Sequence, residues 1–220
     1  MQVKDFMQRD VITVSSQDSI YDALKIFKDK NIRRMPVVDN GKLVGIVTRK
    51  ALREASPSKA TTLSVHELNY LLSKMTIADV MKKKVETISQ DTSIEEAGLR
   101  MHKNQIGGLP VLENDGLIGF ISSNDIFTAI VKINGLDKPV ARITLEIPAV
   151  DWQKTIAKCT EIIDELGCEF KMMSLIKTEN PSIKLLIIRF EETGEIQTIV
   201  DEIKDSNFTI ISVIQNVQRI

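Results

Sequence analysis

The first part of this 220-residue chain repeats itself at a constant spacing of 74 positions, without a gap between Met7 and Gly45. Matched pairs include Met7 and Met81, Val11 and Val85, Thr13 and Thr87, Ser19 and Ser93, Ile32 and Ile106, Pro36 and Pro110, and Gly45 and Gly119. An internal duplication of this kind builds half-modules that stack on one another. We expect a pseudo-twofold pair with clefts where the halves meet, and we expect function to reside in those clefts.

Composition narrows the class of protein. The apolar fraction of 43% is sufficient for a globular core, and 29 Lys and Arg against 30 Asp and Glu leave the chain nearly neutral. The net charge of the chain is therefore too small to hold it on nucleic acid or on an anionic membrane. Because the N-terminal residues lack a signal-peptide pattern and no uncharged run approaches a membrane span, we expect a cytoplasmic protein. Cys159 and Cys168 match no zinc pattern and indicate small, partly buried thiols.

Each repeat encodes the same order of elements. A capping box opens a helix at Ser19 and again at Ser93, with apolar residues at helical spacing behind it. Two strands joined by a polar turn follow the helix, and a hydroxyl residue precedes the next helix. The predicted strands are 35–38 and 43–47 in the first repeat, and 109–112 and 117–121 in the second. Asn and Gly in turns 39–42 and 113–116 are suited to positive φ angles.

These motifs, found twice in register, resemble a tandem pair of CBS domains over residues 1–132. The resemblance implies repeat one at 1–55, an inserted helix within 56–75 and repeat two at 76–132. CBS pairs sense adenosyl ligands, and in that family the sensing element is Thr or Ser followed three residues later by Asp. Ser122 and Asp125 match this element, two residues after Phe120.

A hydroxyl and main-chain N–H groups at a helix start suit a phosphate, and a nearby carboxylate suits the ribose hydroxyls. The alternative interpretation of Ser122 and Asp125 is ordinary helix capping, because the same residue types are preferred there. The first repeat departs from the pattern, since Ala51 stands three residues after Thr48 where the carboxylate belongs. That cleft is either empty or binds without the ribose contact.

Basic residues surround the first-repeat site. Arg33 and Arg34 precede the first strand, and Arg49, Lys50 and Arg53 follow Thr48. Arginine is suited to bidentate phosphate contacts, and a solvated basic face is the alternative. By resemblance, the adenine ring is held in one cleft by Val11, Ile12, Thr13, Ile32 and Arg33, and in the other by Val85, Thr87, Ile106, Gly107 and Gly108. The two glycines favour either close approach of a ligand or a tight turn.

An amphipathic helix is predicted between the repeats at 64–72, and it is a candidate to help cover a dimer surface. This stretch, together with the residues that lead into Met81, is similar to the bacterial acetoin-utilisation regulatory protein family. That resemblance implies a C-terminal domain that follows the CBS pair.

The C-terminal part, residues 133–220, has the pattern of a ferredoxin-like βαββαβ domain, so the predicted fold class is α/β (α+β). Strands are predicted at 141–147, 168–176, 183–190 and 209–214, with helices at 155–166 and 195–203. The order resembles an ACT domain, a family that often binds amino acids. The loop 148–153 lacks the glycine of amino-acid-binding members, so dimerisation is the expected role.

No catalytic constellation emerges, because the only histidines are His66 and His102 and there is no Walker loop. We expect a non-enzymatic regulator that binds AMP, ADP or ATP and requires no cofactor or metal. We also expect a homodimer held in part by 137–220, acting on itself or on a regulated partner protein. The alternatives are a sensor of S-adenosylmethionine or NAD, a constitutive scaffold with degenerate clefts, and, less favoured, an enzyme with regulatory domains.

Overall fold

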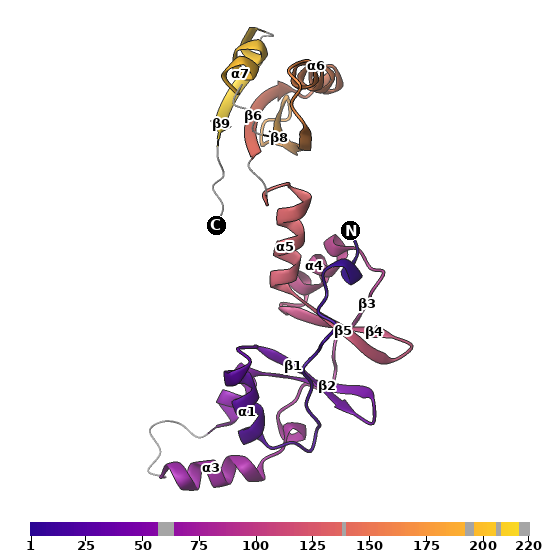
Figure 1. Ribbon diagram of the computed structural model, residues 1–220, viewed down its shortest axis with the longest axis vertical. Coiled ribbons are helices and arrows are strands. Elements are labelled where there is room, and N and C mark those ends of the chain that lie inside the picture. The colour runs from indigo at the N-terminus through magenta and orange to yellow at the C-terminus, as the bar shows by residue number, and fades with distance from the viewer. Residues whose placement is uncertain (57–63, 138–139, 192–195, 206–207, 216–220) are drawn as a thin grey trace. The chain divides into compact units, whose positions relative to one another are not determined.

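The computed structural model describes residues 1–56, 64–137, 140–191, 196–205 and 208–215. The chain divides into two compact units, Met1–Phe127 and Thr128–Ile220, and each is described by itself (Figure 1). Residues 57–63 of the predicted insert, Pro139 of the second domain and the predicted helix start at Glu195 lie outside the described residues.

The first unit contains the two repeats in the order that the sequence predicts. Repeat one comprises η1 (Val3–Asp5), α1 (Ile20–Asp29), β1 (Arg34–Asp39), β2 (Lys42–Thr48) and α2 (Arg49–Ala55). Repeat two comprises η2 (Ile77–Asp79), β3 (Ile88–Ser89), α4 (Ile94–Lys103), β4 (Gly108–Glu113), β5 (Gly116–Ser122) and α5 (Ser123–Ile133). The inserted helix α3 (Val65–Lys74) lies between them, and α5 continues across the boundary between the units. The mixed α/β fold is confirmed.

Both predicted hairpins form, and their registers correspond. Pro36 pairs with Ile46 in the first, and Pro110 pairs with Phe120 in the second. Asn40 and Gly41 take the positive φ angles of the first turn, at 49° and 76°. In the second turn the prediction for glycine is wrong, because Asn114 and Asp115 take these angles and Gly116 begins β5. Asn and Asp tolerate the left-handed region better than other side chains, so the shift by one position costs little.

The repeats share one five-stranded sheet and exchange their leading segments. The strand order is β1-β2-β5-β4-β3. Gln8, which precedes repeat one's helix, forms a bridge with Phe120 of repeat two, and Lys82 forms the equivalent bridge with Ile46 of repeat one. Each repeat is therefore completed by a segment of the other, which explains why the duplication forms one unit.

Glycines make this exchange possible. A Cβ on Gly119 would lie 2.7 Å from Met7 Sδ, and a Cβ on Gly45 would lie 2.6 Å from Met81 Sδ. Such separations are shorter than van der Waals contact, so a side chain at either position would force the methionine of the other repeat away from its place on the strand. The Met and Gly positions that match in the sequence duplication therefore contact each other across the repeats, Met7 with Gly119 and Met81 with Gly45.

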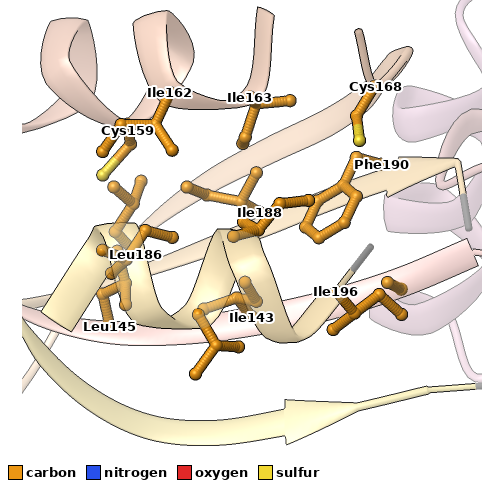
Figure 2. Packing of buried hydrophobic residues seen from close by; sticks show 14 of the residues in the cluster. Ile143, Leu145, Cys159, Ile162, Ile163, Cys168, Leu186, Ile188, Phe190 and Ile196 are labelled. Atoms are coloured by element: carbon orange, nitrogen blue, oxygen red, sulfur yellow. The ribbon is translucent and has the colours of Figure 1, made fainter. Parts of the chain in front are cut away.

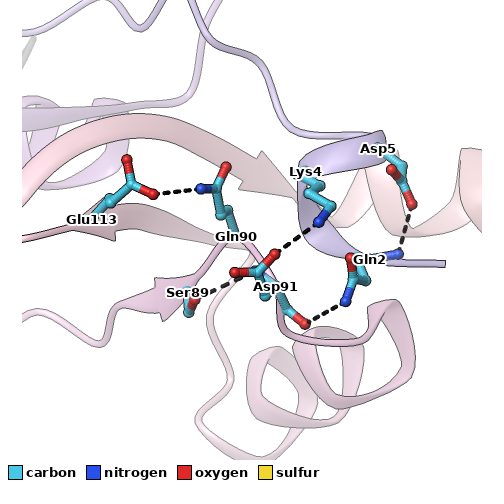
Figure 3. A network of polar contacts seen from close by, with 7 residues as sticks. All are labelled: Gln2, Lys4, Asp5, Ser89, Gln90, Asp91 and Glu113. Carbon is cyan, nitrogen blue, oxygen red and sulfur yellow. Dashed lines mark hydrogen bonds and ion pairs between the residues drawn. The ribbon is translucent and has the colours of Figure 1, made fainter.

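Polar contacts hold the first residues of the chain on repeat two (Figure 3). Lys4 Nζ lies 2.8 Å from Asp91 Oδ1, and Gln2 Nε2 donates to the Asp91 carbonyl at 3.1 Å. The hydrogen bond and charge of Asp91 raise the pKa of Lys4. Because these side chains are exposed, they contribute less than the neighbouring main-chain bond from Val3 N–H to the Thr92 carbonyl, at 2.9 Å.

The core of repeat one lies between its helices and its hairpin. The predicted buried stripe of α1 is Ile20, Ala23, Leu24 and Phe27; Leu24 is partly buried and the other three are fully buried. Met35 and Val37 of β1 are fully buried as well. Each large side chain buried in this way contributes roughly 1.5–3 kcal/mol before entropy is counted. In α3, Ser64 forms the predicted cap with Glu67, Leu72 is buried and Leu71 is exposed.

The second unit is a four-stranded antiparallel sheet with two helices on one face. Its elements are β6 (Val140–Pro148), α6 (Trp152–Glu165), β7 (Phe170–Lys177), β8 (Ile183–Glu191), α7 (Ile196–Asp205) and β9 (Thr209–Ile214). The order β7-β8-β6-β9 is that of a ferredoxin-like βαββαβ domain. Helix α6 begins three residues before its predicted start at Thr155, after Asp151 in a left-handed conformation.

The core of this unit is formed by alternate residues of the two central strands (Figure 2). Ile143 and Leu145 of β6 pack with Leu186, Ile188 and Phe190 of β8 against both helices. Because strand side chains alternate between faces, Arg142, Thr144 and Glu146 lie on the other face of the sheet.

Candidate functional site

Two of the clefts in the CBS-like unit combine residues of both repeats. The first, with a volume of about 670 Å³, contains Thr48 and Ala51 from the end of β2 and the start of α2. Its remaining lining residues are Arg34, Ile46, Val80, Lys82, Lys84, Val85, Glu86, Asn104, Gln105, Ile106, Gly107 and Gly108. The second, of about 330 Å³, is lined by Gln8, Asn31, Ile32, Arg33, Arg34, Gly107, Phe120, Ser122, Ser123 and Asn124.

The exchange of segments explains this mixture. Ser122 ends β5 of repeat two, and the same cleft receives Ile32 and Arg33 from the loop before β1 of repeat one. Thr48 occupies the corresponding position in repeat one, and its cleft receives Ile106 and Gly107 from repeat two. Each hydroxyl therefore faces the loop of the opposite repeat.

Ser122 and Asp125 are bonded to each other. The Ser122 N–H and hydroxyl both donate to Asp125 Oδ2, each at 2.7 Å. Asp125 N–H returns a longer bond of 3.4 Å to Ser122 Oγ. This is the arrangement of a capping box, and Thr76 with Asp79 repeats it at η2. The carboxylate is thus held at the start of α5, with its second oxygen available for a further bond.

The corresponding position in repeat one keeps only the hydroxyl half of this arrangement. Thr48 Oγ1 accepts from the Ala51 N–H at 3.1 Å, and Ala51 supplies no carboxylate. The main chain is otherwise equivalent, since Arg49 N–H donates to the Arg33 carbonyl at 3.0 Å and Ser123 N–H donates to the Gly107 carbonyl at 3.1 Å. The two clefts share a backbone but differ in their charged groups.

Arg34 lies on the wall that both clefts share. Its Nη1 donates to the Gly107 carbonyl at 2.9 Å, and it lines both cavities. Burial, followed by the nearby charge of Arg33, lowers the pKa of Arg34. Among the ion pairs of the described residues, none includes either arginine. A guanidinium group without a carboxylate partner in a cleft is suited to binding an oxyanion.

The glycines opposite Arg34 lie in close contact with side chains of the protein itself. A Cβ on Gly107 would lie 2.8 Å from Arg34 Cζ, and a Cβ on Gly108 would lie 2.6 Å from Phe120 Cε1. The two explanations expected from sequence were a tight turn and close approach of a ligand. The structure adds a third, which is that Arg34 and Phe120 pack directly on this strand.

Several other predicted site residues lie outside the cavity linings. Among them are Asp125, whose carboxylate is bonded to Ser122, and Val11, whose repeat-two equivalent Val85 does line a cleft. The remaining three are Ile12, Thr13 and Thr87. Lys82 and Lys84 were not predicted, although the run 82–84 carries three lysines and the spacing of 74 places Lys82 opposite Gln8.

The described residues contain no group of three or more His, Cys, Asp or Glu side chains arranged to hold a metal ion. His66 and His102 are exposed. Within the same described ranges, the longest apolar helices fall short of what is needed to cross a membrane.

Comparison with known proteins agrees with the duplication. The CBS domain family matches residues 3–58 and 77–132. A CBS domain-containing protein of Dictyostelium discoideum is 32% identical over 133 residues, which are 60% of this chain and 92% of the relative. Inosine-5'-monophosphate dehydrogenase of Nitrosopumilus maritimus is 41% identical over 116 residues, 52% of this chain. The match spans only 21% of that enzyme's length.

Three solved structures are similar to the CBS pair. The CBS domain pair of protein MJ0100, in complex with 5'-methylthioadenosine and S-adenosyl-L-methionine, has 30% identity and a TM-score of 0.50, covering 60% of this chain and 97% of that one. CBSX2 in complex with AMP has 26% identity and a TM-score of 0.51, covering 60% and 97%. A putative acetoin utilization protein (AcuB) from Vibrio cholerae has 29% identity and a TM-score of 0.52, covering 62% and 94%.

The exchanged segments, the two mixed clefts and the family match over both repeats give one conclusion. This chain belongs to the CBS domain family, as a tandem CBS pair followed by a second, four-stranded α/β unit.

Proposed function

We propose that this protein is a non-catalytic regulator whose CBS pair binds an adenine nucleotide, AMP, ADP or ATP. The observation that carries the proposal is the composition of the second cleft, which brings the Ser122 hydroxyl together with Arg33 and Arg34. A hydroxyl donor and two guanidinium groups on one cavity are suited to a phosphate. The complexes of CBSX2 with AMP and of MJ0100 with adenosyl compounds support the ligand class.

Roles for individual residues follow from this placement. Ser122 and the arginines would bind the phosphate. Asp125 does not line the cavity itself, but it is hydrogen-bonded to Ser122, which does, and it would bind the ribose through the oxygen that Ser122 does not use. The adenine would lie against the loop of the opposite repeat, near Ile32 in one cleft and Ile106 in the other. No cofactor is required for this function.

The proposal extends to the second unit and to the cellular role. The βαββαβ order of the second unit supports an ACT-like domain. We expect that domain to form a homodimer through residues 137–220. The likeness to the Vibrio cholerae protein supports a role in regulating acetoin utilisation, in the cytoplasm and through a partner that the chain does not identify.

Calorimetric titration with AMP, ADP, ATP, NAD and S-adenosylmethionine tests the ligand class, with CMP as the matched control. We expect one adenosyl ligand per chain at micromolar affinity, about −8 kcal/mol, and no binding of CMP. If S-adenosylmethionine or NAD binds more tightly than AMP, ADP and ATP, that compound is the ligand and the nucleotide proposal is wrong. Absence of heat with all five compounds would contradict sensing and leave the constitutive scaffold.

A further inference from the structure

The face of the second unit's sheet opposite α6 and α7 carries two arginines directly across from each other. Arg142 of β6 pairs with Arg189 of β8 in the antiparallel register. Both side chains lie on this face because their neighbours Ile143 and Ile188 are in the core. Like charges directly opposite each other on adjacent strands are destabilising, so a nearby anion would stabilise this pair.

The described chain does not supply that anion. Arg142 Nη2 donates to Thr144 Oγ1 at 3.3 Å, and Arg189 Nη1 donates to Asn134 Oδ1 at 3.0 Å, both of them neutral acceptors. The Nε atom of each arginine is buried without a hydrogen-bond partner. Burial, with Arg142 as the second cause, lowers the pKa of Arg189. Ion pairs between the described residues include neither side chain.

One carboxylate lies on the same face of β6. Glu146 is four residues beyond Arg142, which is about 13 Å along a strand, too far for a bond within the chain. Glu146 also has no ion pair with another described residue. The strand therefore carries unmatched positive charge at one end of this face and an unmatched negative charge at the other.

The surroundings favour a protein surface over a small anion. Leu185 and Ile187 of β8 are half-buried on this face, beside Glu146 and Thr144 in the register. Ile176 of β7 is 44% exposed and Ile214 of β9 is 40% exposed. Apolar side chains that flank unmatched charges of both signs are typical of an interface that is complementary to itself.

We propose that this face binds the same face of a second copy of the chain, about a twofold axis near Thr144. With the axis perpendicular to the strands and in the plane between the two sheets, the strand direction is reversed, so Glu146 of each copy lies over Arg142 and Arg189 of the other. Packed sheets are about 10 Å apart, a gap that Arg and Glu side chains span together. The carboxylate would supply the negative charge that the two guanidinium groups lack within their own chain. This inference rests on the homodimer in the proposed function and is independent of the nucleotide.

Charge reversal in the full-length protein tests the contact, with the dimer dissociation constant measured by analytical ultracentrifugation. We expect Glu146→Arg and Arg142→Glu each to raise that constant tenfold or more, because each places like charges against one another. The double variant R142E/E146R restores opposite charges across the axis, and we expect it to dimerise within about threefold of the unmodified protein. Glu146→Gln, which cannot create repulsion, should give an intermediate effect.

Asp164→Arg is the control, because Asp164 is exposed on α6. We expect it to leave dimerisation unchanged, and thermal melting shows whether each variant is folded. If the unmodified protein is monomeric, the homodimer and this contact both fail. If the protein is a dimer that the reversals leave intact, or that Asp164→Arg disrupts, this contact alone fails. If the protein is a monomer whose melting temperature rises with phosphate or citrate, and Arg142→Glu abolishes that rise, the arginines bind a small anion and not a second copy.

Discussion

The guanidinium group of Arg34 donates a hydrogen bond to the main-chain oxygen of Gly107, and this bond joins the two repeats at the wall shared by both clefts. The spacing of 74 residues places glycines in repeat two where repeat one has Arg33 and Arg34. The duplication therefore produces two clefts of similar backbone that share one arginine, Arg34.

Replacing Arg34 by glutamine tests the importance of that shared group. Arg34→Gln removes a cation from both clefts, and a lost bond to a charged group costs roughly 1.5–3 kcal/mol, so we expect AMP affinity to fall about tenfold or more. Arg53→Gln is the matched control, because Arg53 is exposed and lines neither cleft. Calorimetric affinity that is equal in the two variants would show that Arg34 has only a structural role.

Gly119 is expected to be intolerant of even a small side chain. In Gly119→Ala the new methyl group would meet Met7 Sδ at 2.7 Å and the Gln8 carbonyl at 3.1 Å. Overpacking of this kind costs about 1–3 kcal/mol, and we expect that loss in the free energy of unfolding measured with urea. Gly98→Ala in α4 is the control, because its nearest contact is longer, 3.3 Å to Ile126. A loss no larger than that of the control would mean that Met7 moves aside freely.

Local structure could be predicted from the sequence because it depends on local signals. Ser19 and Ser93 cap their helices as expected, and the hairpins between 35 and 47 and between 109 and 121 form with equivalent registers. The exchange of segments between the repeats could not be predicted, since the bridge from Gln8 to Phe120 joins residues far apart in the chain. The contribution of Lys82 and Lys84 to a cleft depends on that exchange and was missed for the same reason.

The binding role of the site residues remains a prediction, and the structure places part of them on the clefts. The predicted residues that line the cavities include Thr48, Ile106, Gly107, Gly108, Ile32, Arg33, Phe120 and Ser122. The sequence could not distinguish a ligand-binding Asp125 from a capping one, because both require a carboxylate three residues after a hydroxyl. The bond between Ser122 and Asp125 is compatible with both roles, so measurement has to separate them.

The first cleft is expected to gain a ligand when its missing carboxylate is supplied. Ala51→Asp places a carboxylate three residues after Thr48, whose Oγ1 already accepts from the main chain of residue 51. We expect the calorimetric stoichiometry for AMP to rise from one to two ligands per chain. If the stoichiometry is unchanged, another feature, such as the bulk of Arg34, closes this cleft.

The cysteines are expected to be unreactive in the folded protein. Burial raises the pKa of Cys159 to about 11, and Cys168 is buried as well. At pH 8 a thiol with that pKa is ionised to about one part in a thousand, and only the thiolate reacts. We expect a thiol reagent to modify Cys159 slowly in the native state and rapidly in urea. Fast native modification would show that α6 opens.

The central claim, that the second cleft binds an adenine nucleotide through Asp125, is tested by titrating AMP into Asp125→Ala and Asp22→Ala. Ser19 Oγ donates to Asp22 Oδ2 at 2.6 Å, as Ser122 Oγ donates to Asp125 Oδ2, but Ser122 lines the second cleft whereas Ser19 lines neither cleft. Both variants should lose about 1 kcal/mol of stability through their caps. We expect only Asp125→Ala to bind AMP about tenfold or more weakly. AMP affinity in Asp125→Ala equal to that of Asp22→Ala and the unmodified protein would contradict the account.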